Sequence, residues 1–135
     1  VGECVAECGT GDSDRRFRTD VDVDELKQRI KVNAVSPSQT VAFRFQNRST
    51  RIDLDPGEEE LLAYATTRPD AYLICSPDIA AMKMAYHLGI LDRVVSLEEL
   101  AVKAGRGGLL FRENYTAKWH REKCSEIRMQ DLFDG

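Results

Sequence analysis

The chain has 135 residues, of which 42% are hydrophobic and 31% charged, so it can build the core of a folded domain. The formal net charge of −4 excludes the strongly basic field that drives tight, nonspecific binding to nucleic acid. No apolar run is long enough to span a membrane and no signal-peptide pattern opens the sequence, so we expect a cytoplasmic protein with no membrane partner. In that reducing compartment its four cysteines should be free thiols, and Cys75 should be buried.

The first half of the chain predicts two helices with a strand between them. Acids come early and bases late in Asp22–Val32, which predicts a helix that the Ser36–Ser38 turn ends. Apolar residues alternate with polar ones in Thr40–Gln46, which predicts a half-buried strand. A second helix is expected over Asp55–Arg68, because a capping residue, a proline and three glutamates open it.

The second half alternates strands and helices. Strands are expected at Ala71–Cys75, buried on both faces, and at Arg93–Leu97; helices are expected at Asp78–Leu88, Ser96–Gly105 and Asn114–Phe133. Such alternation favours an α/β fold with a mainly parallel sheet and helices on its faces. Gly105–Gly108 reads as a hinge, so we expect a domain over residues 1–108 and a helical tail over residues 109–135.

Three places offer carboxylates to a single cleft: Glu7, the cluster Glu58–Glu60, and Asp78, which follows a predicted strand directly. Ligand sites in parallel sheets lie outside the carboxyl ends of the strands. Carboxylate oxygens suit Mg²⁺ or Mn²⁺, and such an ion lowers the pKa of a bound water and neutralises charge on a phosphodiester. Each acid also has a structural interpretation: Asp78 as a helix cap, Glu58–Glu60 as first-turn acids, and Glu7 as a solvated side chain.

The stretch Leu54–Gly105 resembles the carboxyl-terminal half of a PIN-like domain. A glycine–glutamate pair opens a helix at Gly57–Glu58, and an apolar strand ends at Ser76-Pro77-Asp78. The segments Leu88-Gly89-Ile90 and Val94-Val95-Ser96-Leu97 then follow in the family's order. The resemblance covers somewhat over a third of the chain.

The resemblance implies a three-layer α/β/α fold and a metal-dependent ribonuclease, often the toxin of a toxin–antitoxin pair. It matches Asp78 to the family's late acid and Glu58 to the acid that opens the preceding helix, and makes Glu7 the candidate for the acid of the early helix. These three residues would be both catalytic and metal ligands for Mg²⁺ or Mn²⁺. The implied partners are RNA and an antitoxin or other protein, and a homodimer is also considered.

The sequence departs from the family at its start, because the expected first strand with its aspartate is not seen before Val1. That departure favours an alternative, a non-catalytic PIN-like module with a degenerate acidic site that serves in interaction or regulation. The retained Glu58 and Asp78 favour the enzyme.

A second constellation consists of cysteines and a histidine. Cys4 and Cys8 are four residues apart, as are His120 and Cys124, so each pair would share a helix face. Together they form a tetrahedral set for a structural Zn²⁺ ion. The alternative is buried thiols near the start of the chain and a surface histidine and cysteine in the tail.

Overall fold

The computed structural model describes residues 33–134. The chain divides into two compact units, Val1–Pro69 and Asp70–Gly135. The predicted helix at Asp22–Val32 lies outside the described residues. In the part of the chain that is described, no helix is both long and apolar enough to cross a membrane.

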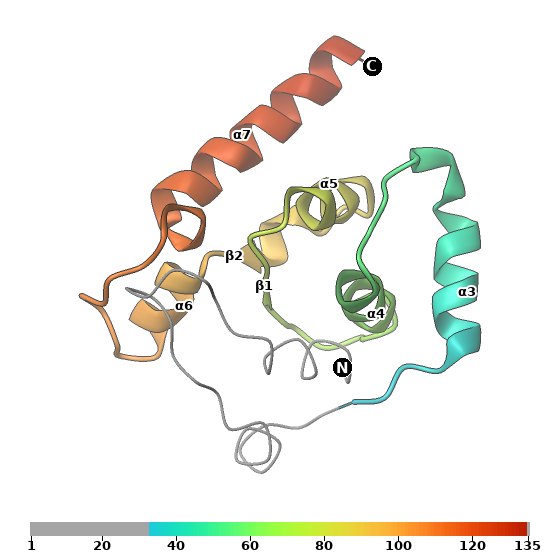
Figure 1. Cartoon of the computed structure of the whole chain (residues 1–135), viewed down its shortest axis with the longest axis horizontal. Helices are drawn as coiled ribbons and strands as arrows, with labels where there is room; N and C mark the ends of the chain where they lie inside the picture. The colour runs from blue at the N-terminus through green and yellow to red at the C-terminus, as the bar shows by residue number, and fades with distance from the viewer. Residues whose placement is uncertain (1–32, 135) are drawn as a thin grey trace. The chain divides into compact units, whose positions relative to one another are not determined.

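The first unit contains two helices joined by a short turn. They are α3 (Pro37–Gln46) and α4 (Pro56–Ala65), with the 3-10 turn η1 (Arg48–Thr50) between them. Helix α3 packs against α4 (Figure 1). Phe43 of α3 and Leu62 of α4 are both buried, so each helix contributes an apolar side chain to the core.

The predicted strand at Thr40–Gln46 is wrong, because this segment is most of helix α3. The side chain of Ser36 accepts a hydrogen bond from the amide of Gln39, and the Gln39 side chain accepts one from the amide of Ser36. This capping box, followed by Pro37 in the first turn, starts the helix. The turn predicted to end an earlier helix therefore begins a new one.

A bidentate ion pair links the two helices of the first unit. Arg44 Nη2 lies 2.6 Å from Glu59 Oε1, and Arg44 Nε donates to Glu59 Oε2 at 3.1 Å. The hydrogen bond to Glu59 raises the pKa of the Arg44 guanidinium. Helix α4 itself confirms the helix predicted over Asp55–Arg68.

The second unit is built around two very short parallel strands. In chain order it contains β1 (Ile74–Cys75), α5 (Ile79–His87), η2 (Leu91–Arg93), β2 (Val94–Val95), α6 (Leu97–Lys103), η3 (Glu113–Tyr115) and α7 (Ala117–Asp134). Ile74 pairs with Val94 and Cys75 with Val95, in parallel. The predicted parallel pairing is therefore confirmed, and α5 is the crossover between the strands.

Glycines end two helices of this unit. Gly89 has φ of 76° and follows α5, and Gly105 has φ of 78° and follows α6. The amide of Ile90 bonds back to Ala85 O, and that of Arg106 to Ala101 O. These are the left-handed helix ends that glycine adopts without a steric penalty.

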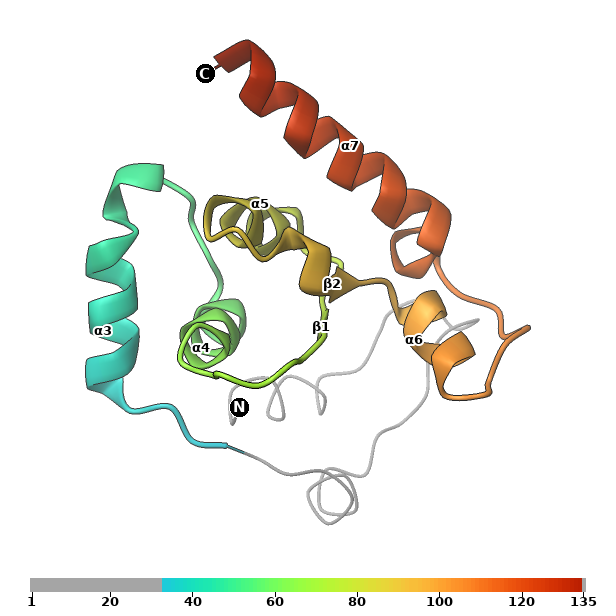
Figure 2. The same ribbon diagram turned by 180° about the vertical axis from the view of Figure 1, so that it is seen from behind.

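The predicted carboxyl-terminal helix is α7, and it packs against α5 and α6 (Figure 2). Its inward face carries His120, Cys124 and Ile127, all buried. Further along the helix, the hydroxyl of Tyr86 on α5 donates to Asp131 Oδ2 at 2.8 Å. The apolar contact and this hydrogen bond dock α7 on the rest of its unit.

The strand expected at Ala71–Cys75 to be buried on both faces is much shorter and is buried on one face only. Strand β1 covers two residues, with Ile74 buried and Cys75 exposed. Successive side chains of a strand point to opposite faces, so a single covered face buries only one of them. The prediction that Cys75 is a buried thiol is therefore wrong, and Cys124 is buried instead.

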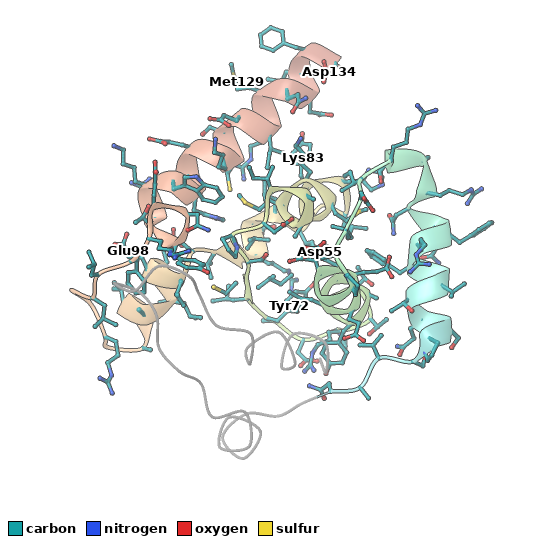
Figure 3. All side chains as sticks on the ribbon, viewed as in Figure 1. Asp55, Tyr72, Lys83, Glu98, Met129 and Asp134 are labelled. Atoms are coloured by element: carbon teal, nitrogen blue, oxygen red, sulfur yellow. The ribbon has the colours of Figure 1, made fainter. Side chains whose placement is uncertain are left out.

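Replacing Met82 with alanine should destabilise the protein by about 2–5 kcal/mol, because Met82 is 0% exposed and its loss leaves a cavity. Met129, labelled in Figure 3 on α7, is 52% exposed and provides a matched control. Met129→Ala should change the free energy of unfolding by less than about 0.5 kcal/mol. Urea denaturation followed by circular dichroism measures both, and equal losses would contradict the packing of α5.

An alkylating reagent such as N-ethylmaleimide should modify Cys75 quickly in the native protein and Cys124 only slowly. Burial raises the pKa of both thiols, so access to the reagent decides the rates: Cys75 is exposed, whereas Cys124 is buried. Peptide mass spectrometry at successive times separates the cysteines, and labelling in denaturant gives the reference. Equal native rates for the two thiols would contradict the described burial.

Candidate functional site

Asp78 caps helix α5 and is the third residue after the carboxyl end of β1. Its Oδ1 accepts a hydrogen bond from the amide of Ala81 at 2.9 Å, so the capping interpretation is confirmed. Within residues 33–134, no hydrogen bond or ion pair engages the other carboxylate oxygen, Oδ2. The half-buried carboxylate can therefore cap the helix with one oxygen and offer the second to a ligand.

Two buried serines mark the carboxyl edge of the strand pair. Extending the register of β1 and β2 by one residue sets Ser76 opposite Ser96. Ser76 Oγ accepts from the amide of Asp78 at 3.3 Å, and Ser96 Oγ accepts from the amide of Glu99 at 3.0 Å. Both hydroxyls thus fix the turn from a strand into the following helix. This edge of the sheet is therefore polar. Ligand sites of parallel sheets lie at the same edge, outside the carboxyl ends of the strands.

Glu58 lies in the first turn of α4, as predicted, and Asp55 is an acidic neighbour whose role as a candidate ligand the sequence analysis missed. Asp55 occupies the N-cap position, yet its side chain makes no capping hydrogen bond. A carboxylate oxygen of Asp55 and one of Glu58 lie within 4.8 Å of each other. Their spacing of three residues at a helix start was the available signal. Asp55, labelled in Figure 3, therefore forms an acid pair with Glu58.

The remaining predicted acids are accounted for differently. Glu59 is the partner of Arg44 and so serves the contact between α3 and α4. Glu7 lies outside the described residues. Of the three predicted ligands, Glu58 belongs to the first unit and Asp78 to the second.

The acids of each unit have the chemistry for a hard divalent cation. Asp55 and Glu58 in the first unit, and Asp78 in the second, carry carboxylate oxygens, which Mg²⁺ and Mn²⁺ prefer over nitrogen or sulfur. All three lie at the amino-terminal ends of helices. The positive end of a helix dipole stabilises an ionised carboxylate there, although it also repels a cation. The ionised acids therefore have to outweigh the helix ends for a cation to bind.

His120 and Cys124 face each other on the inner side of α7. Cys124 Sγ lies 3.5 Å from His120 Nε2, and both residues are buried, so the prediction that this pair shares a helix face is confirmed. Burial raises the pKa of the Cys124 thiol, Glu99 raises it further, and Arg128 acts against both. A raised pKa keeps the thiol protonated near neutral pH, so a thiolate nucleophile is not supported. Cys4 and Cys8 lie outside the described residues, and the Zn²⁺ set remains a prediction.

Comparison with known proteins gives no relative: no family model, no curated protein and no solved structure matches the chain.

Proposed function

We propose that this chain is a PIN-like, metal-dependent ribonuclease with a three-layer α/β/α fold. Asp55, Glu58 and Asp78 would hold a Mg²⁺ or Mn²⁺ ion, with Glu7 as a further ligand. The proposal joins the resemblance of Leu54–Gly105 to the acids described above. A toxin role beside an antitoxin in the cytoplasm is the corresponding cellular proposal.

The observation that carries the proposal is the acid pair at the start of α4. Two carboxylates within 4.8 Å repel each other, and a shared divalent cation removes that repulsion. Asp55 is not engaged as a capping side chain, so helix capping does not account for its position beside Glu58. A metal ligand role does account for it.

Asp78 supports the proposal from the second unit. It follows a parallel strand, and its Oδ2 is not engaged by the described residues. When bound, a divalent ion would neutralise phosphodiester charge and lower the pKa of a coordinated water. The chain's own contribution would be to hold the carboxylates and orient the phosphodiester for in-line attack.

A specific observation favours the alternative, a non-catalytic PIN-like module. Asp78 already has a structural task, because its Oδ1 caps α5. A capping side chain also begins the helix that follows each strand: Asp78 begins α5 after β1, and Ser96 begins α6 after β2. If these caps are the whole reason for the polar edge, the chain keeps the fold and acts through a protein partner.

Manganese should raise the melting temperature of the wild-type protein, and this increase should shrink in Glu58→Gln and Asp78→Asn. Binding to the native state stabilises it by about 2.7 kcal/mol when the ion is at a hundred times its dissociation constant. Asparagine caps helices about as well as aspartate, so Asp78→Asn removes the charge and keeps the cap. Thermal melts with and without manganese measure the shift.

The matched control for the melts is Glu122→Gln on the exposed side of α7. It removes one carboxylate and should leave the manganese shift at the wild-type value. A wild-type shift of zero, or an equal shift in all variants, would rule out the acids as ligands.

Wild-type protein should cleave a labelled single-stranded RNA with manganese present and not with EDTA. Glu58→Gln and Asp78→Asn should each slow cleavage by about 100-fold, since they remove charge that holds the ion. Gel analysis of time courses gives the rates, with Glu122→Gln again as control. A protein that binds manganese through these acids yet leaves RNA intact would instead support the non-catalytic module.

A further inference from the structure

The end of helix α3 presents an aromatic ring and two arginines to solvent. Phe45 is 64% exposed although it is a large apolar residue, and Arg48 and Arg51 are exposed beside it in sequence. We call these three residues the α3 tip. An exposed aromatic ring beside arginines can act as a stacking platform for a base.

The ring and one guanidinium are already arranged against each other. Arg48 Cζ lies 3.9 Å from the centroid of the Phe45 ring, and Arg48 Nη1 donates to the backbone oxygen of Phe45 at 2.6 Å. The cation–π contact and the hydrogen bond together restrict both side chains. A ligand that stacks on them meets two planar groups whose conformational freedom is already reduced.

The segment that forms the tip carries positive charge only, and the next acid along the chain is Asp53, two residues after Arg51. No acid occurs from Asn33 to Ile52, a segment with three arginines in a chain whose net charge is −4. Arg44 is used by Glu59, whereas no carboxylate of residues 33–134 pairs with Arg48 or Arg51. Within residues 33–134, therefore, no ion pair competes with an anionic ligand for these two arginines.

The backbone at Arg51 adds an independent feature. Arg51 has φ of 56°, the left-handed conformation, and is the one non-glycine residue of the described chain with positive φ. Glycine or asparagine adopts this conformation more readily. Arg51 therefore holds a strained conformation in which glycine would be relaxed, which suggests that its side chain has a function.

We infer that the α3 tip binds single-stranded RNA, with Phe45 and Arg48 stacking on a base and Arg48 and Arg51 contacting phosphates. An exposed ring stacked with arginine favours a ligand that has both flat bases and a charged backbone. An acidic peptide or free phosphate would use the arginines and leave the ring without a role. The inference deepens the proposed function, because it names where the RNA would be held.

The test is fluorescence anisotropy of a labelled single-stranded RNA of about 12 nucleotides, in EDTA and over a series of salt concentrations. The variants are Phe45→Ala and the double variant Arg48→Ala/Arg51→Ala. The control is Arg106→Ala/Arg121→Ala, which removes the same charge from exposed positions of the second unit. Circular dichroism melts establish that each variant is folded.

The double variant should weaken binding by about tenfold or more at low salt and reduce the salt dependence of log K by about 1.4, for two lost phosphate contacts. Phe45→Ala should weaken binding by about fivefold or more through lost stacking. The control should stay within about twofold of wild type. Wild type that does not bind RNA at low salt, or tip variants that bind like wild type, would overturn the inference. Equal competition by polyglutamate would also overturn it, because charge alone would then explain binding.

This test and the test of the proposed function can fail separately. Binding measured in EDTA does not need the ion. If the tip binds RNA but the protein does not cleave it, this inference stands and the proposed ribonuclease activity is wrong. Conversely, the tip variants should keep the manganese shift in melting temperature. Tip variants that lose that shift would contradict the assignment of separate roles.

Discussion

The strand pair of the second unit is too short to be stable by itself, so the unit depends on helix packing for its stability. Strands β1 and β2 pair over two residues each, far below what a stable ladder needs. Helix burial has to supply the missing free energy, and α5 does so with Met82 and Ala85, both 0% exposed. Because α5 is held by apolar packing, the residue that caps it is held as well. The position of Asp78 therefore follows from packing that lies one turn away from it.

The candidate acids share a local setting that links folding and chemistry. Asp55, Glu58 and Asp78 all stand where a helix begins, and a helix start favours negative charge whether or not an ion is bound. The same carboxylate can thus be selected for stability, for ion binding, or for both. Asp55 differs from Asp78 here, because only Asp78 uses a side-chain oxygen to cap its helix. A metal ion bound at Asp78 would share that carboxylate with the helix cap, whereas one bound at Asp55 would not.

Helix ends and the parallel pairing could be predicted because they are set by neighbouring residues. Ser96, Asp78 and Gly89 act within a few residues of themselves, so their roles are visible in the sequence. Helix α3 was missed because alternating Val41, Phe43 and Phe45 imitate a strand, whereas the capping box at Ser36 decides the structure. The exposure of Cys75 depends on packing, which local pattern does not encode. The spacing of Asp55 and Glu58 was visible in the sequence, but the absence of a capping hydrogen bond from Asp55 depends on its side-chain rotamer, which is why only part of the candidate site was found.

The capped strand ends have a consequence for how this chain can change in length. Ser96 alone separates β2 from α6, and its buried hydroxyl closes the junction. An inserted residue there would move the cap away from its amide and rotate α6 relative to the strand. By contrast, residues 102–110 are all exposed, and Gly105 and Gly108 supply turns within them. Natural insertions and deletions, or an engineered tag, should therefore accumulate between α6 and η3 and be absent where strand passes into helix.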